Sequence, residues 1–199
     1  MKLDKKHENR IEFIADAVPL SFANMIRRYS MTRVPVLAMD AVTFYDNTSP
    51  FWDEYISHRL GLMPLITPAK TPASAEIIFS LDAEGPKTVY SSDLKSSDKD
   101  IKVAKSIPLV TLGPAQHMRF EAKAVLGTGK KHAKFQAGLV SYGQEGKGLR
   151  FFVESFYQMT PVEVIKRGCE IIEDDVEAIE SALGKKPEKK AAKKKKKAE

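Results

Sequence analysis

Cysteine is almost absent from this chain of 199 residues, in which Cys169 is the single one. One cysteine excludes a disulfide within the chain and any zinc site built from several cysteines. Long apolar runs are also missing, and residues 1–13 lack the apolar core of a signal peptide. We therefore expect a cytoplasmic protein that does not span a membrane.

The net positive charge is confined to one segment. The net charge is +6, but residues 185–199 hold nine Lys and two Glu, a net +7 that leaves the rest of the chain at −1. A Lys run of this kind is usually disordered, and it attracts nucleic acid at most weakly and in a salt-dependent way. The near-neutral remainder does not favour a nucleic-acid-binding body.

Catalytic motifs are missing as well. The glycines at 127 and 129 precede Lys130, but a phosphate-binding loop would need Gly at position 124 and Ser or Thr at position 131, where the chain has Ala124 and Lys131. No Ser/His/Asp or Cys/His constellation is evident, so we predict no catalytic residues. Glu54 and His58, four apart on an expected helix, offer at most two metal ligands, and an ion-paired helix face is the commoner explanation.

The hydrophobic pattern predicts an α+β fold. Strands are expected at residues 10–18, 34–45, 75–81, 88–90, 107–112, 118–125 and 149–157, and helices at 18–35, 51–60 and 160–184. In the strand at 118–125, apolar residues alternate clearly with charged ones. Residues 2–9 are expected to be frayed, and residues 127–131 and 142–148 to be loops.

The last helix has the strongest local signal. Thr160, Pro161 and Glu163 form a capping box with proline at the first helical position, and Gly184 ends the helix. Its apolar residues repeat with spacings of 3 and 4, which is a seam typical of helix pairing: Val162, Ile165, Cys169, Ile172, Val176, Ile179 and Leu183. We expect the seam to be covered by another helix, either the opening helix or one from a second chain.

The opening helix has two unlike faces. Phe22, Met25, Ile26 and Tyr29 are spaced as one apolar face, which we expect to be buried. The other side carries Asn24, Arg27 and Arg28. Such a face is most often simply solvated, but its donors would also suit the carboxylates or backbone carbonyls of a partner.

Three stretches resemble the α-type subunits of cellular RNA polymerases, in particular the family of the archaeal D-type and eukaryotic third subunits. The first is Asn24-x-x-Arg27-Arg28 followed by Pro35, the second is residues 53–65 (DEYISHRLGLMPL), and the third is residues 132–135 (HAKF). Phe135 replaces the Trp usual in the family. The residues that carry the second and third motifs are Asp53, Glu54, His58, Arg59, Leu60, Gly61, Pro64, His132, Ala133 and Lys134.

The resemblance implies a non-catalytic assembly subunit of DNA-directed RNA polymerase. It implies a split dimerisation domain made of residues 1–39 and 148–184, an inserted β-rich domain at 40–147, and the Lys-rich tail at 185–199. The dimerisation domain would pair with a small α-like partner, subunit L, through the seam of the last helix. Asn24, Arg27 and Arg28 would face the partner and a large subunit, and the pair would form the platform for the small subunits N and P and the two large catalytic subunits.

Two features of the family are not expected here. Some archaeal relatives carry iron–sulfur cysteines in the inserted domain, but residues 40–147 contain no cysteine, so we predict no cluster. Only the Lys-rich tail follows Leu183, in place of the DNA-contacting domain of bacterial α subunits. The alternatives are a nucleic-acid-binding protein acting through the tail and a small metal-dependent hydrolase using Glu54 and His58.

Overall fold

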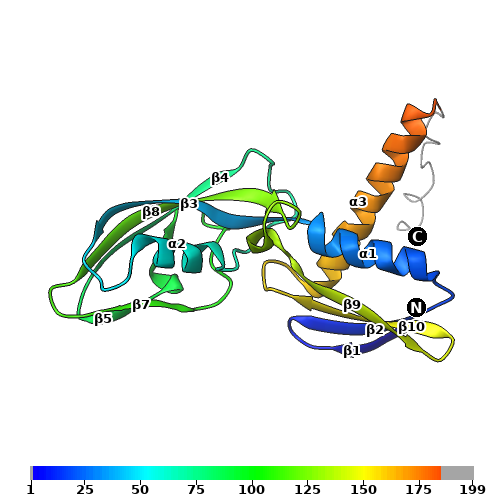
Figure 1. Ribbon diagram of the computed structural model, residues 1–199, viewed down its shortest axis with the longest axis horizontal. Coiled ribbons are helices and arrows are strands. Elements are labelled where there is room, and N and C mark those ends of the chain that lie inside the picture. Colours follow the sequence, from blue (N-terminus) through cyan, green and yellow to red (C-terminus); the bar gives the residue numbers. More distant parts are fainter. Residues whose placement is uncertain (1, 185–199) are drawn as a thin grey trace, which may run out of the picture.

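The computed structural model describes residues 2–184, so the predicted tail at 185–199 lies outside the described residues (Figure 1). The chain folds into two lobes, each built on a four-stranded antiparallel sheet (Figure 1). The α+β class expected from the sequence is confirmed.

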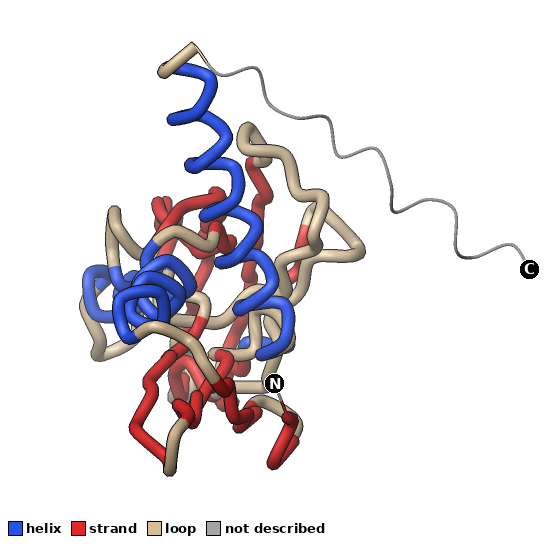
Figure 2. Tube along the Cα trace, turned by 90° about the vertical axis from the view of Figure 1, so that its right-hand side faces the viewer, coloured by secondary structure: helices blue, strands red, loops and turns tan. Residues whose placement is uncertain are grey.

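The first lobe combines both ends of the chain. Its sheet has the order β1-β2-β10-β9, with bounds Lys2–Lys6, Arg10–Asp16, Gly148–Ser155 and Gly138–Glu145. Helices α1 (Leu20–Thr32) and α3 (Pro161–Ala182) lie on one face of this sheet (Figure 1). The outer part of α3 projects beyond the rest of the lobe (Figure 2).

Alternation along β2 and β10 explains why the helices cover that face. Ile11 and Ala15 point into a core shared with Phe151 and Val153, and the ring of Phe13 stacks on Phe151 at 5.0 Å between centroids. The opposite face is polar, and its centre is an ionic cluster in which three carboxylates surround Arg150: those of Asp4, Glu12 and Glu145. A sheet with one apolar face must bury it, and the two helices do so.

The second lobe is built on the sheet β3-β8-β4-β6, with bounds Pro35–Asn47, His117–Thr128, Glu76–Glu84 and Lys95–Ser96. Helix α2 (Asp53–Gly61) lies between this sheet and a two-stranded ribbon of β5 (Lys87–Tyr90) and β7 (Pro108–Leu112) (Figure 1). The predicted alternation in β8 is confirmed, because Met118, Phe120, Ala122 and Ala124 are all buried. This lobe closes over its own core.

Strand β3 connects the two lobes. Val36 and Ala38 belong to the apolar core of the first lobe, whereas Leu37 and Met39 belong to the core of the second. Successive side chains of a strand point to opposite faces, so the start of β3 lies between the two cores. Thr67, which is buried beside it, accepts a hydrogen bond from the Leu37 N–H at 3.0 Å and donates one to Leu65.

Two expectations from the sequence are corrected by the structure. Residues 2–6 are not frayed but form β1, a short edge strand that pairs with β2. Strand β9 was missed, and residues 142–145 belong to it instead of to a loop. Strand β9 pairs with β10 in the first sheet, so residues 138–155 form a hairpin.

The buried face of α1 is also different from the one expected. Ile26 is buried as predicted, but its buried neighbours are the small residues Ala23 and Ser30, and Phe22 is 41% exposed. The reason is the close crossing of α3, where a Cβ on Gly168 would lie 3.1 Å from the Ser30 Cα. Small residues allow this approach, and the larger apolar side chains of α1 are rotated toward its flanks.

Candidate partner-binding surfaces

The first half of α3 is covered by the chain itself. Its capping box is present, since Thr160 Oγ1 accepts from the Glu163 N–H at 3.3 Å and the Glu163 carboxylate accepts from the Thr160 N–H at 3.0 Å. Gly184, with a φ of 76°, follows the helix end as predicted. The side that packs against α1 and the sheet carries Val164, Gly168 and Ile172, all buried.

The second half of α3 is exposed. Among the predicted seam residues only Ile172 is buried, at 7% exposure, while Ile165 and Cys169 are half-buried and Val162 is exposed. Val176, Ile179 and Leu183 are 48%, 60% and 75% exposed. Exposing apolar side chains to water is unfavourable. A continuous exposed stripe of them therefore usually marks a surface that binds a partner.

A groove extends this stripe onto α1. Its volume is about 330 Å³, and its lining includes Phe22, Cys169, Ile172 and Val176. Phe22 of α1 therefore continues the apolar stripe of α3. We call the outer part of this stripe together with Phe22 the α3 seam surface, which consists of five side chains: Phe22, Cys169, Val176, Ile179 and Leu183.

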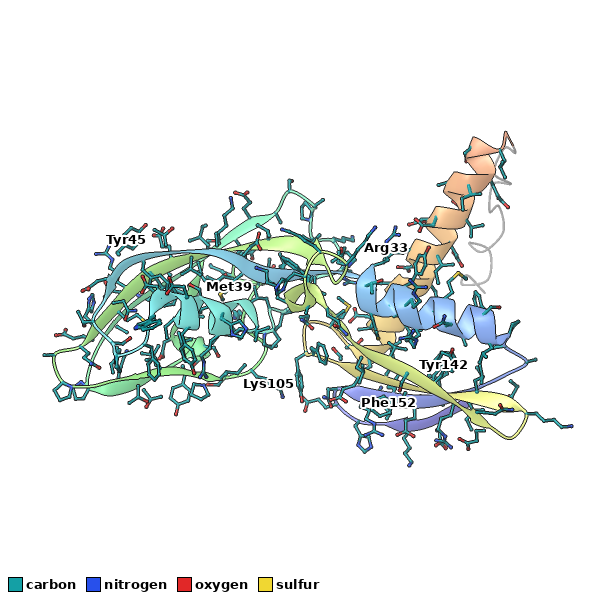
Figure 3. All side chains as sticks on the ribbon, viewed as in Figure 1. Arg33, Met39, Tyr45, Lys105, Tyr142 and Phe152 are labelled. Carbon is teal, nitrogen blue, oxygen red and sulfur yellow. The ribbon has the colours of Figure 1, made fainter. Side chains whose placement is uncertain are left out.

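A polar cluster lies where the covered half of α3 ends. The Tyr29 hydroxyl donates to the Asp175 carboxylate at 3.0 Å, and the Arg33 guanidinium reaches the same carboxylate at 3.2 Å. The hydrogen bond to Asp175 raises the pKa of Tyr29, because ionisation would place two negative charges together. Arg33 also lies over the Tyr29 ring, at the end of α1 beside α3 (Figure 3). Sequence reasoning missed Arg33 and Asp175, and no local pattern identifies the pair.

The second candidate surface is a cationic groove of about 520 Å³ along α1. Arg28, Arg33 and Lys130 line it together with Asn24 and Tyr29. Arg27 is half-buried and donates to Asn24 Oδ1, at 2.9 Å through its terminal nitrogen. Of the donors predicted on this face, Arg28 is therefore the exposed one, and Lys130 was not foreseen.

Most of the motif at 53–65 is structural. Leu60 and Gly61 are buried under the second sheet, and Arg59 donates to the Pro108 carbonyl at 2.6 Å, which ties α2 to the ribbon. Asp53 accepts from the Asn47 amide at 2.7 Å, and the carbonyl of Pro64 accepts from the Ala104 N–H. Glu54 and His58 are exposed. The motif therefore builds the second lobe.

The motif at 132–135 joins the two lobes. Lys134 is mostly buried and contacts the Asp40 carboxylate at 2.6 Å and the Met39 carbonyl at 3.2 Å, and the hydrogen bond from Lys134 lowers the pKa of Asp40. His132 caps the short turn at Ala133 by accepting from the Lys134 N–H. Phe135 is fully buried, with its ring 2.7 Å from where a Cβ on Gly127 would lie. Glycine at 127 is therefore required for the ring to fit.

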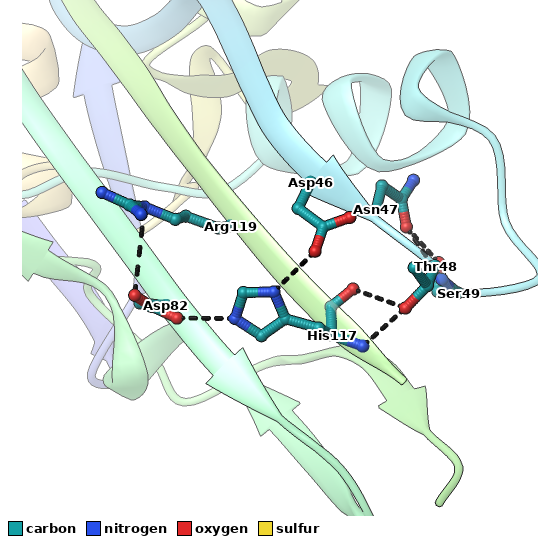
Figure 4. Close-up of polar contacts among 7 residues, drawn as sticks. All are labelled: Asp46, Asn47, Thr48, Ser49, Asp82, His117 and Arg119. Carbon is teal, nitrogen blue, oxygen red and sulfur yellow. Dashed lines mark hydrogen bonds and ion pairs between the residues drawn. The ribbon is translucent and has the colours of Figure 1, made fainter. Parts of the chain in front are cut away.

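One histidine cluster lies at the far end of the second lobe. The two ring nitrogens of His117 contact Asp46 at 2.8 Å and Asp82 at 2.7 Å (Figure 4). The hydrogen bonds to Asp46 and then Asp82 raise the pKa of His117. Because the three residues come from β3, β4 and β8, the cluster connects three neighbouring strands.

We also searched the described residues for a metal site, a reactive cysteine and a membrane-spanning helix. Within residues 2–184 there is no group of three or more His, Cys, Asp or Glu side chains that could hold a metal ion. Burial raises the pKa of the Cys169 thiol, which disfavours the reactive thiolate at neutral pH. In the same part of the chain, every helix is too short or too polar to cross a membrane. The two surfaces on α1 and α3 are thus the features that need an explanation.

Comparison with known proteins identifies the class. Residues 42–142 match the family model for the RNA polymerase Rpb3/RpoA insert domain. They cover β4–β8, the second half of β3 and most of β9. The chain belongs to the Rpb3/RpoA family of RNA polymerase subunits.

The individual relatives are all Rpo3 subunits of archaeal RNA polymerases. The chain is 40% identical to DNA-directed RNA polymerase subunit Rpo3 of Methanocaldococcus jannaschii over 181 residues, which cover 88% of this chain and 93% of the relative. It is 45% identical over 150 residues to the Rpo3 subunit of Pyrococcus horikoshii, covering 71% of this chain and 58% of the relative. With the Rpo3 subunit of Halobacterium salinarum it shares 40% identity over 135 residues, 67% of this chain and 54% of the relative. The chain thus spans just over half of the Pyrococcus and Halobacterium proteins and nearly all of the Methanocaldococcus one.

Proposed function

We propose that this chain is a non-catalytic assembly subunit of DNA-directed RNA polymerase, corresponding to the D-type subunits of archaea. It pairs with a small α-like subunit, subunit L, and the pair is the platform for assembly of the polymerase. The observation that carries the proposal is the α3 seam surface, an apolar helix face left exposed in a member of this family. The role implies that the chain works in the cytoplasm.

The proposal assigns a different task to each lobe. The first lobe, with α1 and α3, is the dimerisation domain, and it includes β9 and β10 as well as the amino-terminal residues up to β3. The second lobe is the inserted domain, which closes over its own core and contacts other subunits. Exposed aromatic side chains at the start of α2, among them Trp52 at 80% exposure, support a contact there with the small subunits N and P.

The cationic groove on α1 is assigned to a large catalytic subunit. Arg28 and Lys130 present guanidinium and ammonium groups that suit the carboxylates or carbonyls of such a partner. Asn24 and Arg27 support the groove by binding each other along α1. The groove and the α3 seam surface share no lining residue.

We further propose that the chain carries no iron–sulfur cluster. The support is compositional, since the chain has one cysteine and clusters are held by several cysteine thiolates. Cys169 instead contributes its side chain to the α3 seam surface.

Affinity purification of the tagged chain from native extract tests the proposal. The wild-type chain should recover one small protein and two very large ones, and the recovered complex should make RNA on a DNA template. Ile179→Asp places a charge on an exposed part of the seam surface and should reduce recovery of the small protein at least about tenfold. Ile66→Asp, at an exposed isoleucine of the second lobe, is the matched control and should retain it. Equal recovery of the small protein by Ile179→Asp and wild type would contradict the assignment of the seam surface.

Arg28→Ala separates the two surfaces. It removes the exposed guanidinium from the cationic groove without touching the α3 seam surface. We expect the large chains to be recovered several-fold less well, while the small partner is retained. Loss of the small partner in this variant would place Arg28 at the other interface.

A further inference from the structure

The exposed half of α3 is unusually acidic. Between residues 170 and 182 the helix has no Lys, Arg or His and six carboxylates: Glu170, Glu173, Asp174, Asp175, Glu177 and Glu180. Asp175 is bound by Tyr29 and Arg33 on α1, and Glu170 lies 3.7 Å from Lys166. Glu173 and Glu177 line the apolar groove itself. The acidic charge therefore borders the α3 seam surface directly.

The acidic residues follow the seam in a regular way. Glu173 and Glu180 each come one residue after a seam position, at Ile172 and Ile179, so they form one edge of the stripe. On the other edge, Asp175 faces α1. In paired helices, residues at these flanking positions meet the flanking residues of the partner and set which partner is accepted. The edge of the stripe that lies away from α1 is thus acidic along its length.

This placement weakens α3 as an isolated helix. The carbonyl end of a helix favours cations, and α3 has no basic residue in its last turn. Glu173 and Glu177 are also like charges four residues apart, an arrangement that opposes helix formation. A contact with a partner helix explains acidic residues in these positions better than the stability of α3 does.

We propose that the α3 seam surface takes a partner helix whose flanking positions carry Lys or Arg, and that its acidic edge disfavours pairing with a second copy of this chain. The existence of a partner rests on the proposed function. What is added is the charge of the partner helix and the reason why the chain pairs with a different chain and not with a second copy of itself. The exposed apolar stripe from Cys169 to Leu183 is about 21 Å long at 1.5 Å per residue, which a helix of three heptads covers. A second copy would bring one acidic edge against another.

Two synthetic three-heptad helices test the proposal. Both carry Ile and Leu at the seam positions, one with Lys and the other with Glu at the flanking positions. Binding to the full chain is followed by fluorescence anisotropy of the labelled peptide. The Lys-flanked peptide should bind at least about tenfold more tightly at low salt, and the difference should shrink as salt rises. Equal binding of the two peptides would overturn the proposal.

Charge reversal gives the matched variant. A chain with Glu173→Lys, Glu177→Lys and Glu180→Lys should prefer the Glu-flanked peptide, and far-ultraviolet circular dichroism verifies that it is folded. An unchanged preference would overturn the proposal. Because these substitutions leave the apolar residues in place, such a result would leave the proposed function standing, which Ile179→Asp tests separately.

Two further measurements test whether the α3 seam surface is occupied instead by the chain's own residues 185–199 or by a second copy of the chain. A chain ending at Gly184 lacks the Lys-rich residues 185–199 and should bind the Lys-flanked peptide like the full chain. If only the shortened chain binds it, the chain's own tail is the occupant and the assignment to a partner is wrong. Sedimentation should show the wild-type chain as a monomer, and a dimer that Ile179→Asp abolishes would overturn the exclusion of a second copy.

Discussion

The two halves of α3 carry the same apolar repeat but have different surroundings. Residues 161–172 pack against α1 and the first sheet, with Val164 and Ile172 buried and Gly168 in contact with Ser30. Residues 173–182 leave Val176 and Ile179 exposed and are rich in acidic side chains. One half of the helix therefore stabilises the lobe, and the other is available to pair with a partner.

A heptad repeat in a single chain therefore predicts that a helix face is buried but does not identify the helix that buries it. The small residues Gly168 and Ser30 let α1 pack closely on the side of α3 that carries Val164 and Gly168, and Ile172 is the one position of the repeat that is buried. Beyond the crossing, α3 projects away from the rest of the lobe (Figure 2), and Val176, Ile179 and Leu183 remain exposed.

The largest effect should come from filling the crossing. Gly168→Leu introduces a side chain against the Cα and Cβ of Ser30, so we expect a loss of about 3 kcal/mol in the free energy of unfolding, measured in urea. Ala178→Leu adds a leucine to the exposed half of the same helix and should change it by less than about 0.5 kcal/mol. Similar losses in the two variants would mean that the two halves of α3 do not differ in packing.

An intermediate effect is expected from one substitution made in both halves. Val164→Ala removes two methyl groups from a fully buried site and should cost about 2 kcal/mol. Val176→Ala removes the same atoms from a site that is 48% exposed and should cost less than about 0.5 kcal/mol. The same urea titration measures both, and a reversed order would mean that the exposed half is the one that stabilises the lobe.

The smallest effect concerns the boundary between the halves. Asp175→Asn removes the carboxylate that accepts from Tyr29, so the pKa of Tyr29 should fall toward its ordinary value. In the wild-type chain this raised pKa makes the contact stabilising below the ordinary tyrosine pKa, and the stabilisation is lost as pH rises through the folded-state value. Ultraviolet absorbance titration, with a Tyr29→Phe chain subtracted, measures the shift. An unchanged Tyr29 titration would show that the two groups do not interact in solution.

Much of the fold was predictable because local signals agreed with the tertiary structure. The capping box at Thr160, the alternation at Met118–Ala124 and the helix expected at 51–60 all rest on short-range patterns. Each is confirmed, and the structure places that helix at Asp53–Gly61. Strand β9 was missed because its glycines at 138 and 143 resemble loop residues, and β1 because its charged sequence lacks alternation. Both strands are defined by their pairing with neighbours, which no local pattern records.

The candidate surfaces were predictable only in part. The seam and Arg28 were found from periodicity, but Phe22 was assigned to the buried face of α1 because its spacing fits that face. Arg33, Lys130 and Asp175 were missed because their roles depend on the crossing of α1 and α3 and on the loop after β8. These are contacts between segments far apart in the sequence.

Hydrogen–deuterium exchange of the chain, alone and within the purified polymerase, measures the difference between the two halves of α3 in one experiment. We predict that residues 173–183 and the backbone around Phe22 exchange readily in the isolated chain and become the most protected segments of the first lobe on assembly. Exchange at residues 164–172 should change little, because α1 and the sheet already cover that half of the helix. Unchanged exchange at residues 173–183 in the assembled polymerase would show that the exposed half of α3 does not meet a partner.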